Sequence, residues 1–185
     1  FCIRRNRMRR KYPISVLSHL YICFCLSYFI GVLEWIDNEK VLEMMQKSLY
    51  HDIPEAITWD ILTYTKNSVQ WLKELVEEIE EESMINNMFI NINKYKFSKK
   101  LLDFALHPMD GEHWKLVKLS DRFSALFEAQ LESESDKDFK EKFLDLRKNL
   151  NKEKSKSVDY LLKFGVDYFD DDISQNILNK KNINI

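Results

Sequence analysis

Residues 14–36 form a largely apolar run that is long enough to cross a bilayer as a helix, or to lie at the centre of a helical bundle. A basic stretch precedes the run, an order that also occurs in signal peptides and membrane anchors. The run nevertheless contains polar residues, including His19, Ser27 and Glu34, and it lacks a small-residue cleavage pattern. Because polar groups are costly in lipid, we predict a buried helix and no membrane partner.

The chain has few residues that favour tight turns. Only three glycines and three prolines occur among 185 residues, whereas Leu, Lys, Glu, Ile and Phe are plentiful. Strand-rich folds need more turn residues, so the sequence predicts an all-α fold. With 45% apolar and 31% charged residues, the chain is long enough for one buried core, and we expect a single domain.

Charge and cysteine usage exclude several classes of protein. The net charge of −2 gives no reason to expect a protein that coats nucleic acid, although a small anionic ligand remains compatible with it. The cysteines are Cys2, Cys23 and Cys25, whose odd number and close spacing do not predict a disulfide framework. No further paired Cys or His completes a zinc ribbon. A reducing cytoplasm is the expected setting.

Apolar spacing and helix-ending residues predict about seven helices. The expected ranges are about 14–36, 39–51, 67–82, 98–106, 112–132, 137–150 and 158–169, with 84–98 as a connection or short helix. Asn38 and Asp110 are the expected N-caps of the second and fifth helices. Pro54 should end or restart the second helix, because it has no backbone N–H to donate.

Two helices carry acidic residues with different expected roles. The glutamates of 67–82 should form a solvated face opposite an apolar one. In 112–132, Asp121 shares a stripe with Val117 and Glu128, which aims its carboxylate at the interior. An interior carboxylate is costly without a partner, so Asp121 is a candidate functional residue.

His19, His51, Asp52 and Asp121 have the chemistry of a metal site. A divalent ion that assists hydrolysis of a phosphate ester needs nitrogen and oxygen ligands and an open position. Adjacent residues on a regular helix diverge by about 100°, so His51 and Asp52 can share one ion only at a helix end or where a neighbouring element closes in. Pro54 predicts such an end. Taken alone, His19 is equally compatible with a buried histidine that is hydrogen-bonded to a carbonyl group.

The order His, then His-Asp, then a distal Asp resembles the signature of the HD-domain phosphohydrolases. Residues 51–60, HDIPEAITWD, are similar to the His-Asp-x-x-Glu-x-x-Thr-x-Asp segment of the bacterial 5'-deoxynucleotidases. Residues 118–126, KLSDRFSAL, are similar to that family's Lys-x-x-Asp-x-x-x-x-Leu helix. The resemblance spans about residues 3–131.

This resemblance implies an all-α HD-domain bundle. We expect the domain to cover residues 1–170, and the polar C-terminal sequence predicts a frayed tail at 171–185. The resemblance also implies one divalent ion, Co, Mn, Fe or Zn, with Mg less favoured, and Glu55 as the acid/base residue. The implied metal ligands are His19, His51, Asp52 and Asp121, and the implied substrate contacts are Arg4, Asp60, Thr63 and Lys66. Of these contacts, Asp60 would lie near the sugar and the other three near the phosphate. The related nucleotidases are dimers, which implies a homodimer here.

Two positions depart from the family pattern. Arg5 stands where the family has a tryptophan that excludes a 2'-hydroxyl group, and Trp59 stands at a position that is commonly glycine. The resemblance therefore leaves the choice between deoxyribose and ribose open.

The function that we expect is removal of the 5'-phosphate from (deoxy)nucleoside monophosphates. One alternative is an HD-type hydrolase of a triphosphate, cyclic nucleotide or alarmone. A second is a non-catalytic HD-fold binding domain, although a scaffold has no need of the base Glu55. A third is a membrane-tethered protein that uses residues 14–36, which would place His19 in lipid and break the site.

Overall fold

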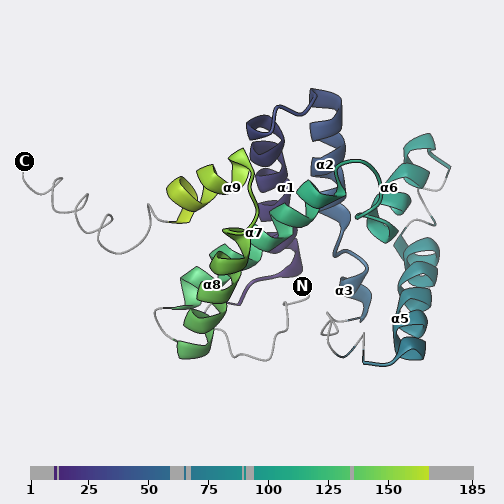
Figure 1. Ribbon diagram of the computed structural model, residues 1–185. Coiled ribbons are helices and arrows are strands. Elements are labelled where there is room, and N and C mark those ends of the chain that lie inside the picture. Colours follow the sequence, from purple (N-terminus) through teal and green to yellow (C-terminus); the bar gives the residue numbers. More distant parts are fainter. Residues whose placement is uncertain are drawn as a thin grey trace, which may run out of the picture.

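In a computed structural model, the described residues form helices and turns, and no β-strand occurs within them. These residues are 11, 13–58, 65, 68–88, 90, 94–133 and 136–166. The helices are α1 (Val16–Leu33), α2 (Asn38–Tyr50), α3 (Glu55–Thr58), α5 (Gln70–Ser83), η1 (Met84–Met88), α6 (Lys96–Leu106), α7 (Trp114–Ser133), α8 (Lys137–Leu150), α9 (Lys156–Tyr160) and η2 (Leu161–Val166) (Figure 1). The predicted all-α fold class is confirmed.

The helices α1, α2 and α7 form the centre of the molecule. Helices α1 and α2 pack side by side, and α7 crosses both of them, while α8 packs along α7 (Figure 1). The main apolar core lies between these helices and the α9–η2 segment. Its fully buried side chains include Ile30, Met44, Phe123, Leu126, Phe139 and Leu150. Helices α1 and α2 are far from α7 in the sequence but meet it here, and the predicted metal ligands lie on these helices or directly after them.

Helix α1 is buried on one face only. Leu20, Cys23 and Ile30 are buried against α2 and α7, whereas Leu17 and Phe29 are more than half exposed. The expectation of a buried helix is therefore correct for one face of α1 and wrong for the other. Within the described ranges, α1 is the one helix whose length and composition would also suit a membrane span. Its buried face packs against α2 and α7, as the face of a core helix does.

The α2–α3 junction follows from its capping residues and from Pro54. The Asp37 side chain accepts a hydrogen bond from the Glu39 N–H at 2.9 Å and caps α2, so the predicted cap at Asn38 is one residue too late. Helix α2 ends at Tyr50, residues 51–54 form a turn, and α3 begins directly after Pro54. The predicted helix end at residues 51–52 is confirmed.

Helix α5 differs from its sequence prediction. It begins later than expected, at Gln70, and continues through a turn of π-helix, η1. Trp71 and Ile79 of the expected apolar face are exposed, whereas Val76 and Glu80 are buried. The expectation of one apolar and one solvated face is wrong here, because α5 packs against α3 rather than against the main core.

The second half of the chain agrees more closely with prediction. Helix α8 has the predicted bounds and is capped by Asp136, whose carboxylate accepts from the Asp138 N–H at 2.8 Å. Helix α7 begins at Trp114, so Asp110 does not directly precede it and the predicted cap at Asp110 is wrong. The Asp110 carbonyl accepts a hydrogen bond from Lys47 Nζ at 2.6 Å. The predicted tail at 171–185 lies outside the described residues.

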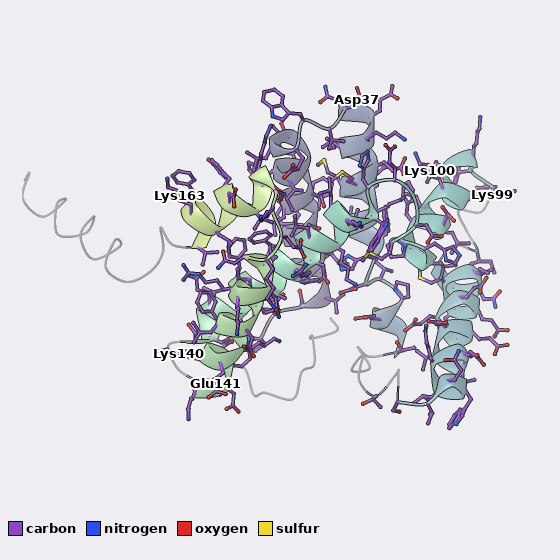
Figure 2. All side chains as sticks on the ribbon, in the orientation of Figure 1. Asp37, Lys99, Lys100, Lys140, Glu141 and Lys163 are labelled. Atoms are coloured by element: carbon purple, nitrogen blue, oxygen red, sulfur yellow. The ribbon has the colours of Figure 1, made fainter. Side chains whose placement is uncertain are left out.

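A smaller apolar cluster joins the end of α2 to η1 and α6. It consists of Met84, Ala105, Tyr50, Ile53, Leu101, Leu102 and Leu106. Many charged side chains lie on the outer surface, as the labelled ones in Figure 2 illustrate, and Lys99, Lys140 and Lys163 are exposed. The turn that carries His51 and Asp52 is thus held between the two apolar clusters.

Candidate metal centre

His19 lies on the buried face of α1 and is held by α7. Its side chain is fully buried, and Nδ1 lies 2.9 Å from Glu128 Oε1 and 2.8 Å from Ser124 Oγ. An ionised carboxylate only accepts hydrogen bonds, so Nδ1 carries the proton in the bond to Glu128. The lone pair then lies on Nε2, which is the arrangement that metal-binding histidines adopt.

His51 follows α2 directly, and its two ring nitrogens have the same roles as those of His19. Its Nδ1 donates to the Ser48 carbonyl at 2.8 Å, so its lone pair also lies on Nε2. The His51 side chain is 5% exposed, and among the described residues its Nε2 is the only buried side-chain nitrogen or oxygen without a hydrogen-bond partner. Such an orphaned atom in a buried position calls for a ligand.

Both imidazoles and both predicted aspartates converge on one point. His19 Nε2 lies 3.4 Å from Asp52 Oδ2 and 3.2 Å from Asp121 Oδ1. His51 Nε2 lies 3.1 Å from Asp52 Oδ1 and 3.8 Å from Asp121 Oδ1. His51 and Asp52 reach the same point because residues 51–54 form a turn. The structure thus brings together all four residues that the sequence singled out.

The electrostatics of this cluster favour a cation. Burial lowers the pKa of His51, but the charges of Asp52 and Asp121 and the bond to Ser48 outweigh it and raise that pKa to about 9. Burial raises the pKa of Asp121, but its contacts with the His19 and His51 imidazoles hold that pKa well below its usual range. In the absence of a metal, a proton on His51 supplies positive charge that the carboxylates attract. Two imidazole nitrogens with carboxylate oxygens form a donor set that fits Mn, Fe, Co or Zn.

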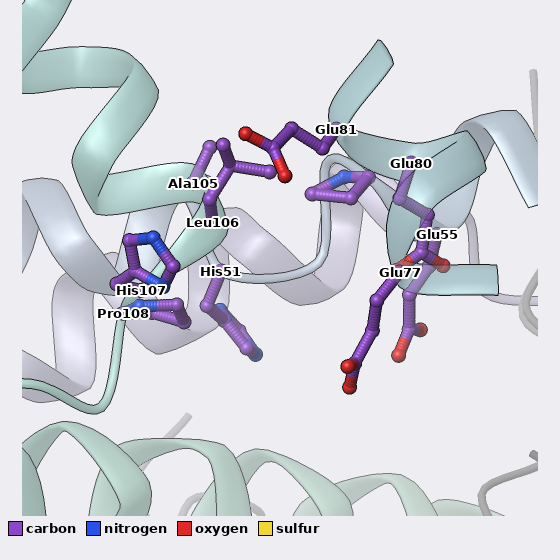
Figure 3. Close-up of a pocket in the computed structure, with 10 residues that line it drawn as sticks. His51, Glu55, Glu77, Glu80, Glu81, Ala105, Leu106, His107 and Pro108 are labelled. Atoms are coloured by element: carbon purple, nitrogen blue, oxygen red, sulfur yellow. The ribbon is translucent and has the colours of Figure 1, made fainter. Parts of the chain in front are cut away.

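A pocket of about 380 Å³ opens beside His51. It is lined by His51, Pro54, Glu55, Glu77, Glu80, Glu81, Ala105, Leu106, His107 and Pro108. Figure 3 shows His51 between the glutamates of α3 and α5 on one side and His107 and Pro108 on the other. Glu55 begins α3, so the structure places the predicted acid/base residue in the same pocket as His51.

The acidic wall of this pocket is a feature that sequence reasoning missed. Glu80 is 7% exposed and accepts a hydrogen bond from Thr58 Oγ1 at 2.7 Å, which ties α5 to α3. The prediction that the glutamates of this helix are only solvated is therefore wrong for Glu80. Glu77, Glu80 and Glu81 are spaced three and four apart and so share a face, but the sequence did not show that this face turns toward His51.

Sequence reasoning also missed the residues around His19. Glu128 was predicted on the Asp121 stripe without a role, and Ser124 was not singled out. Glu128 could have been found from its spacing, because it lies seven residues after Asp121, and two helical turns bring both carboxylates to the same buried face. Four predicted substrate contacts, Arg4, Asp60, Thr63 and Lys66, lie outside the described residues, as do Arg5 and Trp59.

Comparisons with known proteins show the family and the fold. A family model described as "5'-deoxynucleotidase YfbR-like" matches residues 2–169. No curated protein matches the chain significantly. A solved HD-domain phosphohydrolase from Listeria innocua has a TM-score of 0.69 and 23% sequence identity, over 94% of this chain and 86% of that chain, which shows a common fold. The chain therefore belongs to the YfbR-like 5'-deoxynucleotidase family and is a phosphohydrolase with the HD-domain fold.

Proposed function

We propose that this protein removes the 5'-phosphate from nucleoside monophosphates with one divalent ion held by His19, His51, Asp52 and Asp121. The observation that carries the proposal is the convergence of these four side chains next to the pocket that contains Glu55. Co, Mn, Fe and Zn suit a set of imidazole and carboxylate donors better than Mg does.

The protein's own residues have separate roles in this reaction. A bound divalent ion supplies Lewis-acid chemistry to the phosphoryl group and to the attacking water. Glu55 accepts the proton that the water loses as it attacks phosphorus, and a proton returns to the nucleoside oxygen as the phosphorus–oxygen bond breaks. The Ser48 carbonyl and the Glu128 carboxylate keep both imidazoles in the orientation that directs Nε2 to the site.

The charge of the pocket bears on the class of substrate. Its described lining carries four glutamates and no lysine or arginine. Such a wall repels a long polyphosphate chain and tolerates an uncharged nucleoside, so it favours a monophosphate over a triphosphate or an alarmone. Arg4, Thr63 and Lys66 remain the proposed phosphate contacts, and Asp60 the proposed sugar contact.

The first test combines metal analysis with phosphate release from 5'-nucleotides, 3'-nucleotides, triphosphates and cyclic nucleotides. We expect release from 5'-monophosphates alone. Asp52→Ala should lose bound metal and activity together, because it removes a ligand that reaches both imidazoles. Full activity in Asp52→Ala would contradict the proposed site. Stoichiometric metal in the wild type with no release from any compound would favour the non-catalytic alternative.

Glu55→Gln is the matched variant for the acid/base role. Its side chain is nearly isosteric but does not take up the water's proton, so we expect the metal content to stay and turnover to fall by roughly 10²–10⁴-fold. Unchanged turnover in Glu55→Gln would remove Glu55 from the mechanism while leaving the metal site intact.

Sugar selectivity and assembly belong to the same proposal. Comparing each deoxynucleotide with its ribonucleotide tests whether Arg5 and Trp59 relax the choice of sugar. We also propose one domain over residues 1–170, a cytoplasmic location and, as the resemblance to the family implies, a homodimer. Light scattering on the purified full chain tests the dimer, since a monomer mass at all concentrations would contradict it.

A further inference from the structure

Cys23 lies one helical turn after His19 and belongs to the same cluster. Its side chain is fully buried, and Sγ lies 3.4 Å from His19 Nε2 but 3.9 Å from His19 Nδ1. The sulfur is therefore on the Nε2 side of the ring, which is the side that faces the candidate metal position.

The mutual distances in the cluster match ligands of one ion. One ligand atom each from His19, Cys23, His51 and Asp121 lies within 4.8 Å of all the others. With metal bonds of about 2.0–2.3 Å, adjacent nitrogen and sulfur ligands lie roughly 3.1–3.6 Å apart. The observed 3.4 Å between His19 Nε2 and Cys23 Sγ falls within that interval.

A second observation points to a ligand at the same place. His51 contributes to this set of atoms, its side chain is 5% exposed, and its Nε2 has no hydrogen-bond partner. A buried imidazole nitrogen left without a partner is satisfied by a cation at the point where the other donors meet. The sulfur of Cys23 lies within 4.8 Å of the ligand atoms of His51 and Asp121.

We propose that Cys23 is a thiolate ligand of this ion, in addition to His19, His51, Asp52 and Asp121, and that it selects thiophilic metals. This inference deepens the proposed function, because it concerns the same metal site. A soft sulfur donor favours Zn and Co over Mn and Mg, which prefer oxygen donors. The thiol proton passes to solvent as the metal binds.

Cobalt(II) spectroscopy tests the proposal on the full-length chain. A thiolate bound to cobalt gives an intense near-ultraviolet charge-transfer absorption, in addition to the weaker visible bands that any bound cobalt shows. We expect this absorption in the wild type and in Cys25→Ser, the matched control two residues further along α1. It should disappear in Cys23→Ser while the visible bands remain.

Two outcomes would overturn the assignment of Cys23. One is stoichiometric cobalt binding in the wild type without the charge-transfer absorption. The other is persistence of that absorption in Cys23→Ser, which would assign it to another thiol. The wild-type spectrum alone shows whether a thiolate binds the cobalt, even if a variant folds poorly. Cys23→Ala provides a second variant of similar size.

Metal competition measures the predicted selectivity. Cys23→Ser should lower the ratio of Zn affinity to Mn affinity by at least about tenfold. Substituting a residue that only supports a ligand already lowers metal affinity by about tenfold or more, so loss of a ligand should have at least that effect. An unchanged ratio would contradict the selectivity. These outcomes can be distinguished from failure of the proposed activity. A thiolate spectrum without phosphate release supports Cys23 as a ligand and contradicts the proposed reaction. Phosphate release without that spectrum supports the reaction and contradicts Cys23 as a ligand.

Discussion

At the scale of single residues, the orientation of His19 depends on Glu128. The two side chains come from α1 and α7, and the 2.9 Å contact between Nδ1 and Oε1 is buried. A carboxylate that accepts from a metal-binding imidazole fixes its tautomer and makes Nε2 a better donor. Glu128 is therefore a positioning residue.

Glu128→Gln should weaken metal binding by roughly 10–100-fold with little change in fold, because the amide is a poorer acceptor for Nδ1. Titration of the metal-free protein with zinc measures the affinity. The matched control is Glu132→Gln, a buried glutamate one turn further along α7 that accepts from the Lys11 backbone N–H. Equal losses in both variants would mean that the effect of Glu128 is structural.

At the scale of elements, two contacts decide how helices dock on α1. Gly31 faces Val41 so closely that an added Cβ would lie 2.6 Å from Val41 Cγ2, which brings the α1 and α2 backbones together. At the end of α1, Glu34 Oε1 accepts from the Ser157 N–H at 2.7 Å and so holds the start of α9.

Gly31→Ala should destabilise the protein, because overpacking costs about 1–3 kcal/mol and the helix-propensity gain of alanine returns only about 1 kcal/mol. Urea unfolding of Gly31→Ala, Val41→Ala and the double variant tests this. The double variant should recover part of the loss, since it removes the clashing methyl groups. Independent, additive effects would contradict the close packing of α1 and α2 at this point.

Glu34 gives a stability that depends on pH. Burial raises its pKa, but hydrogen bonds from Ser157 and Ser155 and the nearby Lys156 charge outweigh it and lower that pKa below the ordinary value of 4.5. A lowered folded pKa stabilises the protein above the unfolded pKa, and this contribution is lost as pH falls through the folded pKa.

Glu34→Gln should therefore cost about 1 kcal/mol of unfolding free energy near neutral pH, and the difference from wild type should shrink below pH about 4.5. Chemical unfolding between pH 3 and 7 measures it. Glu78→Gln, which changes an exposed glutamate on α5, is the control and should show no such trend. A difference that is constant with pH would contradict the assignment to the Glu34 charge.

At the scale of the whole molecule, the candidate metal centre joins three parts of the chain. His19 comes from α1, His51 and Asp52 from the end of α2, and Asp121 from α7. A metal bound there crosslinks the three central helices and neutralises the charge that their carboxylates concentrate. Metal binding should therefore contribute to the stability of the whole fold.

Removing the metal with a chelator should lower the melting temperature, and adding it back should restore the original value. A ligand at 100 times its Kd stabilises by about 2.7 kcal/mol, which corresponds to roughly 5–10 °C in a protein of this size. Calorimetry measures the shift, and Asp52→Ala should show none. An unchanged melting temperature in the wild type would argue against a bound metal at this centre.

The parts of the fold that were predictable rest on local rules. Few turn residues and helical apolar spacing predicted the all-α class, and Pro54 predicted the helix end at His51 and Asp52, because these signals act within one turn of chain. The faces of α5 were not predictable in the same way. Which side of an amphipathic helix is buried depends on its partner, and α5 packs on α3 instead of on the main core.

For the site, the sequence by itself determined the four candidate ligands, since their residue types carry the chemistry, and the resemblance to the family added Glu55 as the candidate base. Only the tertiary structure decided that Glu128 holds His19, that Cys23 lies near His51 and Asp121, and that Glu77, Glu80 and Glu81 form a wall of the adjoining pocket. The physical reason is distance along the chain. Contacts between residues on α1 and α7, or on α3 and α5, exist only after the helices have packed.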